Sequence, residues 1–240
     1  MQGISARLRR RTATTGGDPL ITYYDLDTGE RTELSAITTS NWVDKTCHLL
    51  VDEYGLDVGD TVLLVLARTH PGHWVTAIWE LACWRLGVTV AVDDGAGARL
   101  VVTGPAYDDA VAVAAGLGAD LTTCSLHPLA LPFTGELPVG VADYALEVRG
   151  QPDQYAAAPV PAGQAAWRSA EAELTQADLV AGAGSAGRVL VRPSTPWTTV
   201  RDGVLAALLG GGSVVVVAGD DDTALERIRN TENVLAAPRP

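Results

Sequence analysis

The sequence predicts an α/β protein in which a mostly parallel sheet is flanked by helices. Short apolar runs alternate along the chain with segments of helical spacing, which is the pattern of β-α-β units. The runs are apolar throughout instead of alternating with polar residues, as expected for strands covered on both faces. With 240 residues, 47% of them hydrophobic and 19% charged, the chain is globular and long enough for a large core.

The N-terminal third contains an arm, a hairpin and two helices. Residues 1–19 hold the main basic cluster and are expected to form a flexible arm, and ITYYDLDTGERTEL is a β-hairpin that turns at Gly29. Ser35 then caps a helix that ends at Gly55. The next elements are a strand at Thr61–Leu66, a helix at His70–Leu86 that is apolar nearly all round, and the strand VTVAV after Gly87.

Further β-α-β units follow. The first comprises Leu100–Thr103, Tyr107–Leu117 and Leu121–Cys124, and a Pro-rich irregular region covers residues 125–166. Regular structure resumes as a helix at Thr175–Ala181, a strand at Arg188–Val191, a helix at Thr198–Leu209, a strand at Ser213–Ala218, a helix at Thr223–Thr231 and a strand at Val234–Ala236. We expect four apolar runs to be neighbours in one sheet: Val62–Leu66, Val88–Val92, Val189–Val191 and Val214–Val217.

The charge and the cysteines exclude several classes of protein. A net charge of -12 argues against a nucleic-acid backbone or an anionic membrane surface as partner. The basic cluster is not followed by the apolar run of a secretory signal, and no apolar segment is long enough for a membrane span. The three cysteines are far apart and form no C-x-x-C, which is typical of reduced thiols. These observations predict a cytoplasmic protein.

Gly182, Gly184 and Gly187 spell G-x-G-x-x-G, the spacing of dinucleotide-binding loops. Such a loop must follow a strand and open a helix, because the helix N-terminus binds the phosphates. Here a helix-like segment precedes the glycines and a β-branched run follows them. We therefore expect an exposed helix-to-strand loop that binds no dinucleotide. Gly95 and Gly97 likewise lack the Lys-Ser/Thr of a P-loop.

Other candidate sites have simpler explanations. His70, His73, Cys124 and His127 are possible zinc ligands, but their spacings match no finger pattern, and histidines at a helix start are ordinarily solvated. Asp220, Asp221 and Asp222 are expected to load the N-terminus of a helix that Thr223 and Glu226 open as a capping box. Ser185 lies outside any G-x-S-x-G elbow. Trp74, Trp79 and Trp84 are expected in the core, with one ring at an interface.

Several segments together resemble the N-terminal part of the adenylate-forming (AMP-binding) superfamily, which includes acyl-CoA synthetases. They are YYDLDTGERTELS, NWVDKTCHLL, YGLDVGDTVLLVLA and ELACWRLGVTVAVD, and later LTQADLV, RVLVRPSTPW, LAALLGGGSVVVVAG and ALERIRNTENVLAAP. The resemblance covers about residues 20–105 and 174–238. It implies that residues 20–97 and 174–240 form the main α/β core, while residues 98–173 form a small β-α-β lobe and the Pro-rich region.

The resemblance also implies a phosphate loop, T-S-G-T-T-G-x-P-K-G, immediately before Leu174. The chain instead reads YAAAPVPAGQAAWRSAEAE, without the Ser/Thr-Gly run or a lysine. The family's adenine-, magnesium- and ribose-binding segments and its C-terminal lid would lie beyond residue 240, so we expect them to be lacking. Lys45, the one lysine, is predicted to point toward water. Arg168, Arg188 and Arg192 lie near the missing loop but would be unsupported contacts for phosphates.

These features predict a non-catalytic, acyl-CoA synthetase-like protein that acts as a binding or assembly module, either as a homo-oligomer or with a partner protein. No catalytic, cofactor-binding or metal-binding residue is assigned, and no cofactor, nucleic-acid or membrane partner is expected. Two alternatives stay open. One is an adenylate-forming enzyme completed by a partner chain, and the other is a sensor of an unidentified small ligand bound at the carboxyl ends of the strands.

Overall fold

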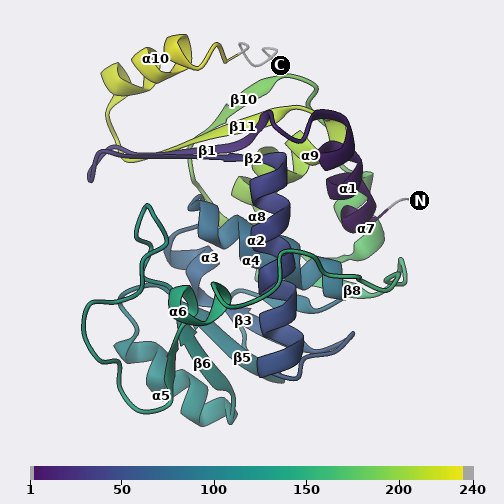
Figure 1. The fold of residues 1–240 in the computed structure, drawn as a ribbon, viewed down its shortest axis with the longest axis vertical. Coiled ribbons are helices and arrows are strands. Elements are labelled where there is room, and N and C mark those ends of the chain that lie inside the picture. Colours follow the sequence, from purple (N-terminus) through teal and green to yellow (C-terminus); the bar gives the residue numbers. More distant parts are fainter. Residues whose placement is uncertain (1–2, 235–240) are drawn as a thin grey trace.

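The computed structural model describes residues 3–234 and arranges them in alternating layers of helices and sheets (Figure 1). A four-stranded sheet lies at the top of the view and a seven-stranded sheet lies below it, with helices between them. Helix α10 (Asp222–Thr231) covers the outer face of the four-stranded sheet, and α5 (Asp108–Leu117) covers the outer face of the seven-stranded sheet. The chain is therefore an α/β protein with mostly parallel sheets flanked by helices.

The four-stranded sheet joins the two ends of the described chain. Its order is β10 (Arg188–Val191), β11 (Ser213–Ala218), β1 (Pro19–Asp25) and β2 (Glu30–Ser35). The predicted N-terminal hairpin is confirmed as the antiparallel pair β1 and β2, with Gly29 at a φ of 76° in the turn. Strand β1 also pairs in parallel with β11, so the hairpin depends on the C-terminal part of the chain.

The seven-stranded sheet is parallel except at one edge. Its order is β7 (Val141–Asp143), β6 (Asp120–Thr123), β5 (Ala98–Thr103), β3 (Thr61–Leu64), β4 (Thr89–Ala91), β8 (Ala165–Arg168) and β9 (Glu173–Thr175). Only the pair β8 and β9 is antiparallel. The β-α-β unit predicted from Leu100 onward is confirmed, and its strands extend the same sheet as β3 and β4.

Some of the remaining helices begin and end near their predicted bounds. Ser35 caps α2 (Ala36–His48), which continues into the π-helical turn η1 (Leu49–Glu53), and α4 (Trp74–Leu86) ends at Gly87 with a φ of 76°. The others are α1 (Ile4–Thr15), α3 (Val65–Thr69), α6 (Tyr144–Val148), α7 (Gln176–Ala181), α8 (Pro196–Val200), η2 (Arg201–Leu205) and α9 (Ala206–Gly210). Of these, α1, α3 and α6 form where the sequence predicts an arm, a strand and an irregular region. Within residues 3–234, no helix combines the length and the apolar character needed to cross a membrane.

One continuous core lies between the two sheets. It includes Val62 and Val90 of the seven-stranded sheet, Val214 and Val216 of the four-stranded sheet, and most of α4. Every residue of α4 except Ala77 is buried, as predicted for a helix that is apolar nearly all round.

The prediction that the four apolar runs share one sheet is wrong. Strands β3 and β4 lie in the seven-stranded sheet, whereas β10 and β11 lie in the four-stranded sheet with β1 and β2. An apolar run shows that both faces of a strand are covered, but it does not specify the neighbouring strand. Here α2 and α4 provide the cover between the sheets, and they separate the two pairs of strands.

Several local predictions also need correction. Residues 1–19, expected to be a flexible arm, contain α1, whose Ile4 and Leu8 are buried against the core. The cap of α10 is Asp221, whose carboxylate accepts a hydrogen bond from the N–H of Ala224, and not a Thr223–Glu226 box. Strand β3 ends at Leu64 because the chain turns into α3. The strand expected at Val234–Ala236 falls largely outside the described residues.

Glu80 is a buried carboxyl group in the middle of α4. Its side chain is 1% exposed, and its Oε1 has no hydrogen-bond partner within the described chain. It lines a small cavity together with Gly72, Thr199 and Gly203. Burial raises the pKa of this carboxyl well above its ordinary value, because the charged form is poorly solvated there.

We expect Glu80→Gln to be more stable than the natural protein at pH 8, by about 1–3 kcal/mol. An amide has the shape of the protonated carboxyl and stays uncharged at every pH. The unfolded chain loses the Glu80 proton near the ordinary pKa of 4.5, while the folded protein keeps it to higher pH. The stability contributed by Glu80 is therefore present below pH 4.5 and falls as the pH rises toward the folded pKa.

Urea unfolding of both proteins between pH 4.5 and pH 8 measures this effect, because contributions from other groups cancel in the difference. The advantage of the variant should shrink toward pH 4.5. A difference that does not depend on pH would show that Glu80 is ionised in the folded protein.

Candidate functional site

The segment before Leu174, where the resemblance implies a phosphate loop, forms a tight turn between β8 and β9. All four backbone N–H groups of the turn already have acceptors. The N–H of Ser169 donates to the carbonyl of Ala172 at 2.9 Å, and that of Ala170 donates to Oδ2 of Asp93 at 2.8 Å. The N–H groups of Glu171 and Ala172 both donate to Oγ of Ser169. The turn therefore presents no free backbone donors to a phosphate.

The side chains around this turn are acidic. Glu171 lies in the turn, Glu173 follows it, and Asp93 contacts it from the end of β4. Arg168 is the adjacent cation, and its Nη2 is engaged by the carbonyl oxygens of Asp94 and Ala96, at 3.3 and 2.9 Å. A triphosphate placed here would meet negative charge and no available cation from this turn.

The two other arginines considered for phosphate contacts are also paired elsewhere. Arg188 contacts Glu232 and Glu33 and donates to Oγ1 of Thr22 at 2.8 Å. Arg192 forms ion pairs with Asp220 and Asp222 at the start of α10. Arg168 is bound by backbone carbonyls, and Arg188 and Arg192 by different carboxylates, so the three guanidinium groups do not converge on one site.

Lys45 does not point freely into water as predicted. Its ammonium group donates to the carbonyl oxygens of Arg149 and Gln151 and forms an ion pair with Asp153 at 3.0 Å. The long side chain reaches from α2 to the irregular segment after α6, which the sequence pattern does not place beside it. Lys45 therefore holds this segment against α2.

The G-x-G-x-x-G glycines lie in the helix-to-strand loop between α7 and β10, and Gly182 and Gly184 are exposed, as predicted. The loop runs against the end of α9, where Ser185 exchanges backbone hydrogen bonds with Ala206 and Gly212. A Cβ atom on Gly184 would lie 2.4 Å from the backbone nitrogen of Gly210. The glycine at position 184 thus allows two backbone segments to pack closely.

The possible zinc ligands do not form a metal site. In residues 3–234, no group of three or more His, Cys, Asp or Glu side chains is arranged to hold a metal ion. The expectation that the helix-start histidines are solvated is wrong for His73, which is 3% exposed and caps α4 by accepting a hydrogen bond from the N–H of Val75. Burial lowers the pKa of His73 to about 3. Cys124 is buried, whereas His127 is exposed.

The three tryptophans of α4 are all buried, so none of them lies at a free interface. Each ring meets a different aromatic partner: Trp74 packs on Trp42, Trp79 on Tyr144 and Trp84 on Trp167. The core position is confirmed, and the expected interface ring is not found.

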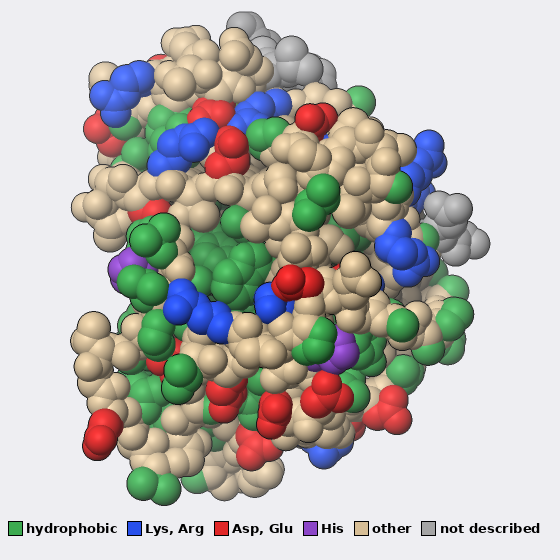
Figure 2. Space-filling model, viewed as in Figure 1, with side chains coloured by type: hydrophobic (Ala, Val, Ile, Leu, Met, Phe, Trp, Pro, Cys, Tyr) green, Lys and Arg blue, Asp and Glu red, His purple; other side chains and the backbone are tan. Residues whose placement is uncertain are grey.

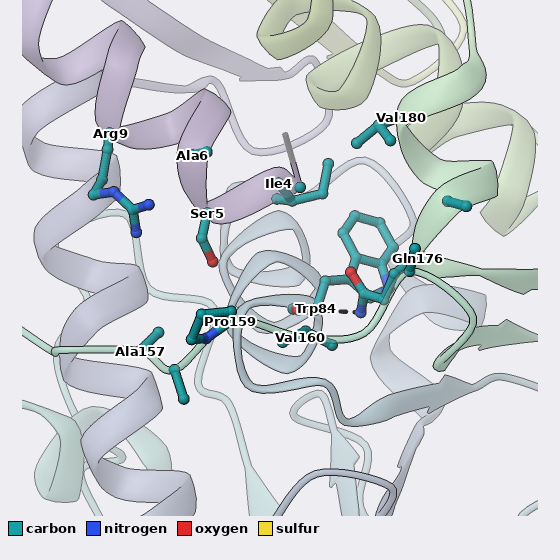
Figure 3. Close-up of a pocket in the computed structure, with 14 residues that line it drawn as sticks. Ile4, Ser5, Ala6, Arg9, Trp84, Ala157, Pro159, Val160, Gln176 and Val180 are labelled. Atoms are coloured by element: carbon teal, nitrogen blue, oxygen red, sulfur yellow. Dashed lines mark hydrogen bonds between the residues drawn. The ribbon is translucent and has the colours of Figure 1, made fainter. Parts of the chain in front are cut away.

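A pocket of about 230 Å³ opens at the start of α1 (Figure 3). Its walls are mainly apolar and come from α1, the segment 157–162, the end of α4 and α7: Ile4, Trp84, Pro159, Val160 and Val180. Ser5, Arg9 and Gln176 supply the polar groups, and Gln176 donates to the carbonyl of Trp84 at 3.1 Å. The sequence does not predict this pocket, because residues 1–19 have the composition of a flexible arm and α1 forms one of the walls.

Comparison with known proteins identifies relatives of this chain. A scan against protein-family models finds no match. A TIGR03089 family protein of Mycobacterium tuberculosis (strain ATCC 25618 / H37Rv) is 39% identical over 224 residues, which cover 90% of this chain and 89% of the relative. The chain belongs to the TIGR03089 family.

Solved structures that are similar to this TIGR03089 family member include acyl-CoA synthetases and a benzoate CoA ligase. An acyl-CoA synthetase of Brucella canis matches with a TM-score of 0.76 at 17% identity, over 97% of this chain and 46% of that chain. A benzoate CoA ligase of Burkholderia xenovorans LB400 matches with a TM-score of 0.71 at 16% identity, over 95% of this chain and 48% of that chain. The N-terminal domain of FACL13 from Mycobacterium tuberculosis matches with a TM-score of 0.69 at 15% identity, over 98% of this chain and 62% of that chain.

These comparisons confirm the fold that the resemblance implies. The TIGR03089 family chain has the fold of acyl-CoA synthetase N-terminal domains, and it spans about half the length of the solved structures it matches. At identities of 14–17% the likeness concerns the fold alone.

The close backbone packing at Gly184 generates a prediction. We expect Gly184→Ala to lower the free energy of unfolding by about 1–3 kcal/mol, because the added methyl group meets backbone atoms of Leu209 and Gly210 that cannot move aside. Gly182→Ala in the same loop is the matched control, since its Cβ would make only an ordinary contact at 3.7 Å. Urea unfolding of both variants tests this, and equal stabilities would contradict it.

Proposed function

We propose that this protein is a non-catalytic binding or assembly module that keeps an acyl-CoA synthetase-like N-terminal fold. The proposal rests on the turn Ser169–Ala172, whose backbone N–H groups all have acceptors within the protein. Adenylation needs a triphosphate held by backbone donors and cations while a negative carboxylate attacks the α-phosphorus. Here the backbone donors are bound by Ser169, Asp93 and a carbonyl, and carboxylates surround the turn.

The pocket of Figure 3 favours a ligand-binding role within this proposal. Its apolar walls and few polar groups are typical of small-molecule sites. It lies beside α1 and α7, and not at the carboxyl ends of the strands of the seven-stranded sheet, where the sequence predicted a sensor site. A sensor of a small, largely apolar ligand is therefore the second candidate function.

We also propose a cytoplasmic location. Cys47, Cys83 and Cys124 are free thiols buried in the protein, and burial raises the pKa of each of them. Such thiols are unreactive and form no disulfides, which suits a reducing compartment.

The non-catalytic proposal predicts no carboxylate-dependent exchange of pyrophosphate into ATP by the purified 240-residue chain in the presence of Mg²⁺. Labelled pyrophosphate, tested with short-chain, long-chain and aromatic carboxylates, measures this reaction, and an active acyl-CoA synthetase serves as positive control. The expected signal is that of the reaction without protein.

If the protein is an adenylate-forming enzyme, carboxylate-dependent exchange should be detected. Two variants then test whether the residues next to the turn support that exchange. Exchange that is lost in Arg168→Ala, next to the turn, but kept in Arg227→Ala, on α10, would overturn the proposal. Exchange that arises only after addition of a second protein would favour an enzyme completed by a partner chain.

A further inference from the structure

Helix α1 carries four arginines and no acidic residue, in a chain whose net charge is -12. In contrast to Arg31, Arg85 and Arg188, none of these four arginines has a carboxylate oxygen within 4.0 Å among the residues that the structure describes. Figure 2 shows basic side chains along the right-hand edge of the view, at the height of α1. Unlike most of the other basic groups, the four arginines of this cluster form no ion pair within residues 3–234.

Three of the arginines line one groove. Arg7, Arg10 and Arg11 lie three and four residues apart and so share a face of α1, which Thr14 and Thr15 continue. This face meets the end of α9, at Leu208–Gly211, and the two helices enclose a groove of about 390 Å³. The cluster is therefore concave and not simply a solvated surface.

Backbone carbonyl groups hold two of the guanidinium groups in place. Arg11 is only 6% exposed, and its Nη1 and Nη2 donate to the carbonyl oxygens of Thr15 and Pro19, at 2.6 and 3.1 Å. Arg7 donates from Nη1 to the carbonyl of Leu209 at 3.4 Å. The Nε atoms of both arginines are buried without a hydrogen-bond partner in the described residues.

A buried guanidinium without a carboxylate is energetically unfavourable, because neutral carbonyl groups replace only part of its hydration. An anion bound in the groove would supply the missing charge. Three guanidinium groups carry three positive charges, so a single carboxylate would leave most of that charge unbalanced. A phosphate group carries up to two negative charges and several acceptor oxygens, and arginine forks match its geometry.

We propose that the groove of Arg7, Arg10 and Arg11 binds the phosphate group of a small phosphate-bearing molecule. The fixed groups of Arg7 and Arg11 form the floor of the site, and the exposed Arg10 closes on the bound phosphate. This site lies between α1 and α9, whereas the turn Ser169–Ala172 joins strands of the seven-stranded sheet. It therefore goes beyond the proposed function and does not depend on it.

Isothermal titration of the full chain with inorganic pyrophosphate at low ionic strength tests the proposal. We expect saturable binding with one site per chain, and at least about fivefold weaker binding in Arg10→Gln. Arg227→Gln is the matched control, because Arg227 is an exposed arginine on α10, and the substitution changes the net charge equally. Pyrophosphate should also raise the melting temperature of the natural protein and of the control more than that of Arg10→Gln.

A second titration, with glycerol phosphate, distinguishes the source of the phosphate group. Tighter binding of the ester than of pyrophosphate identifies an organic phosphate, and the reverse identifies a free inorganic anion. Amide NMR signals of residues 7–15 and 208–211 should shift with either ligand.

Three results would overturn the proposal. The first is the absence of saturable binding up to about 10 mM pyrophosphate. The second is an equal loss of pyrophosphate affinity in Arg10→Gln and Arg227→Gln, which indicates a general effect of net charge. The third is tighter binding of a polyglutamate peptide than of either phosphate, which indicates an acidic protein partner. Arg10 is exposed, so its variant should fold, and circular dichroism checks this. None of these outcomes changes the ATP–pyrophosphate exchange reaction, so the two proposals fail independently.

Discussion

The structure depends on the burial of α4 between two sheets. A helix in that position has no solvated side, so each of its side chains must find apolar or specifically bonded surroundings. Large rings fill most of the space, and Trp74, Trp79 and Trp84 contact aromatic partners from three different parts of the chain. The same burial accounts for the position of the neighbouring elements, because α2 packs along α4 and both sheets contribute valines to the shared core.

The buried polar side chains in and next to α4 are stabilised in three different ways. Arg85 forms a buried ion pair with Asp44 of α2, with 2.8 Å between the charged atoms, and donates to the carbonyl of Tyr155. His73 caps the helix as a neutral imidazole. Oε1 of Glu80 has no such partner among the residues that the structure describes, and burial favours the protonated form of this carboxyl. Breaking the ion pair would leave a buried charge, whereas Glu80 avoids one because its protonated form is neutral.

Different interactions stabilise the core and the turn between β8 and β9. The layers, the strand order and the central helix follow the acyl-CoA synthetase N-terminal fold, because packing of the core determines them. The turn between β8 and β9 lies outside that core, and its local hydrogen bonds with Ser169 and Asp93 stabilise a short acidic conformation. The fold by itself therefore does not identify the function, which must be argued from the residues of the site.

Local chemistry let the sequence alone predict much of the secondary structure. The cap at Ser35, the glycine stop at Gly87 and the strands at Arg188–Val191 and Ser213–Ala218 depend on adjacent residues, and the structure confirms them. The missing Ser/Thr-Gly run and the helix-to-strand setting of the G-x-G-x-x-G glycines were also readable from the order of residues.

Only the tertiary structure decided which strands pair and where charged side chains reach. Apolar runs look alike whether they belong to one sheet or two, so the pairing of β1 with β11 had no signal in the sequence. Lys45 contacts residues about a hundred positions away, and α1 has an arginine-rich sequence that resembles a solvated arm until Ile4 and Leu8 pack against the core. Contacts between residues far apart in the chain depend on the assembled layers, and local propensity carries no information about them.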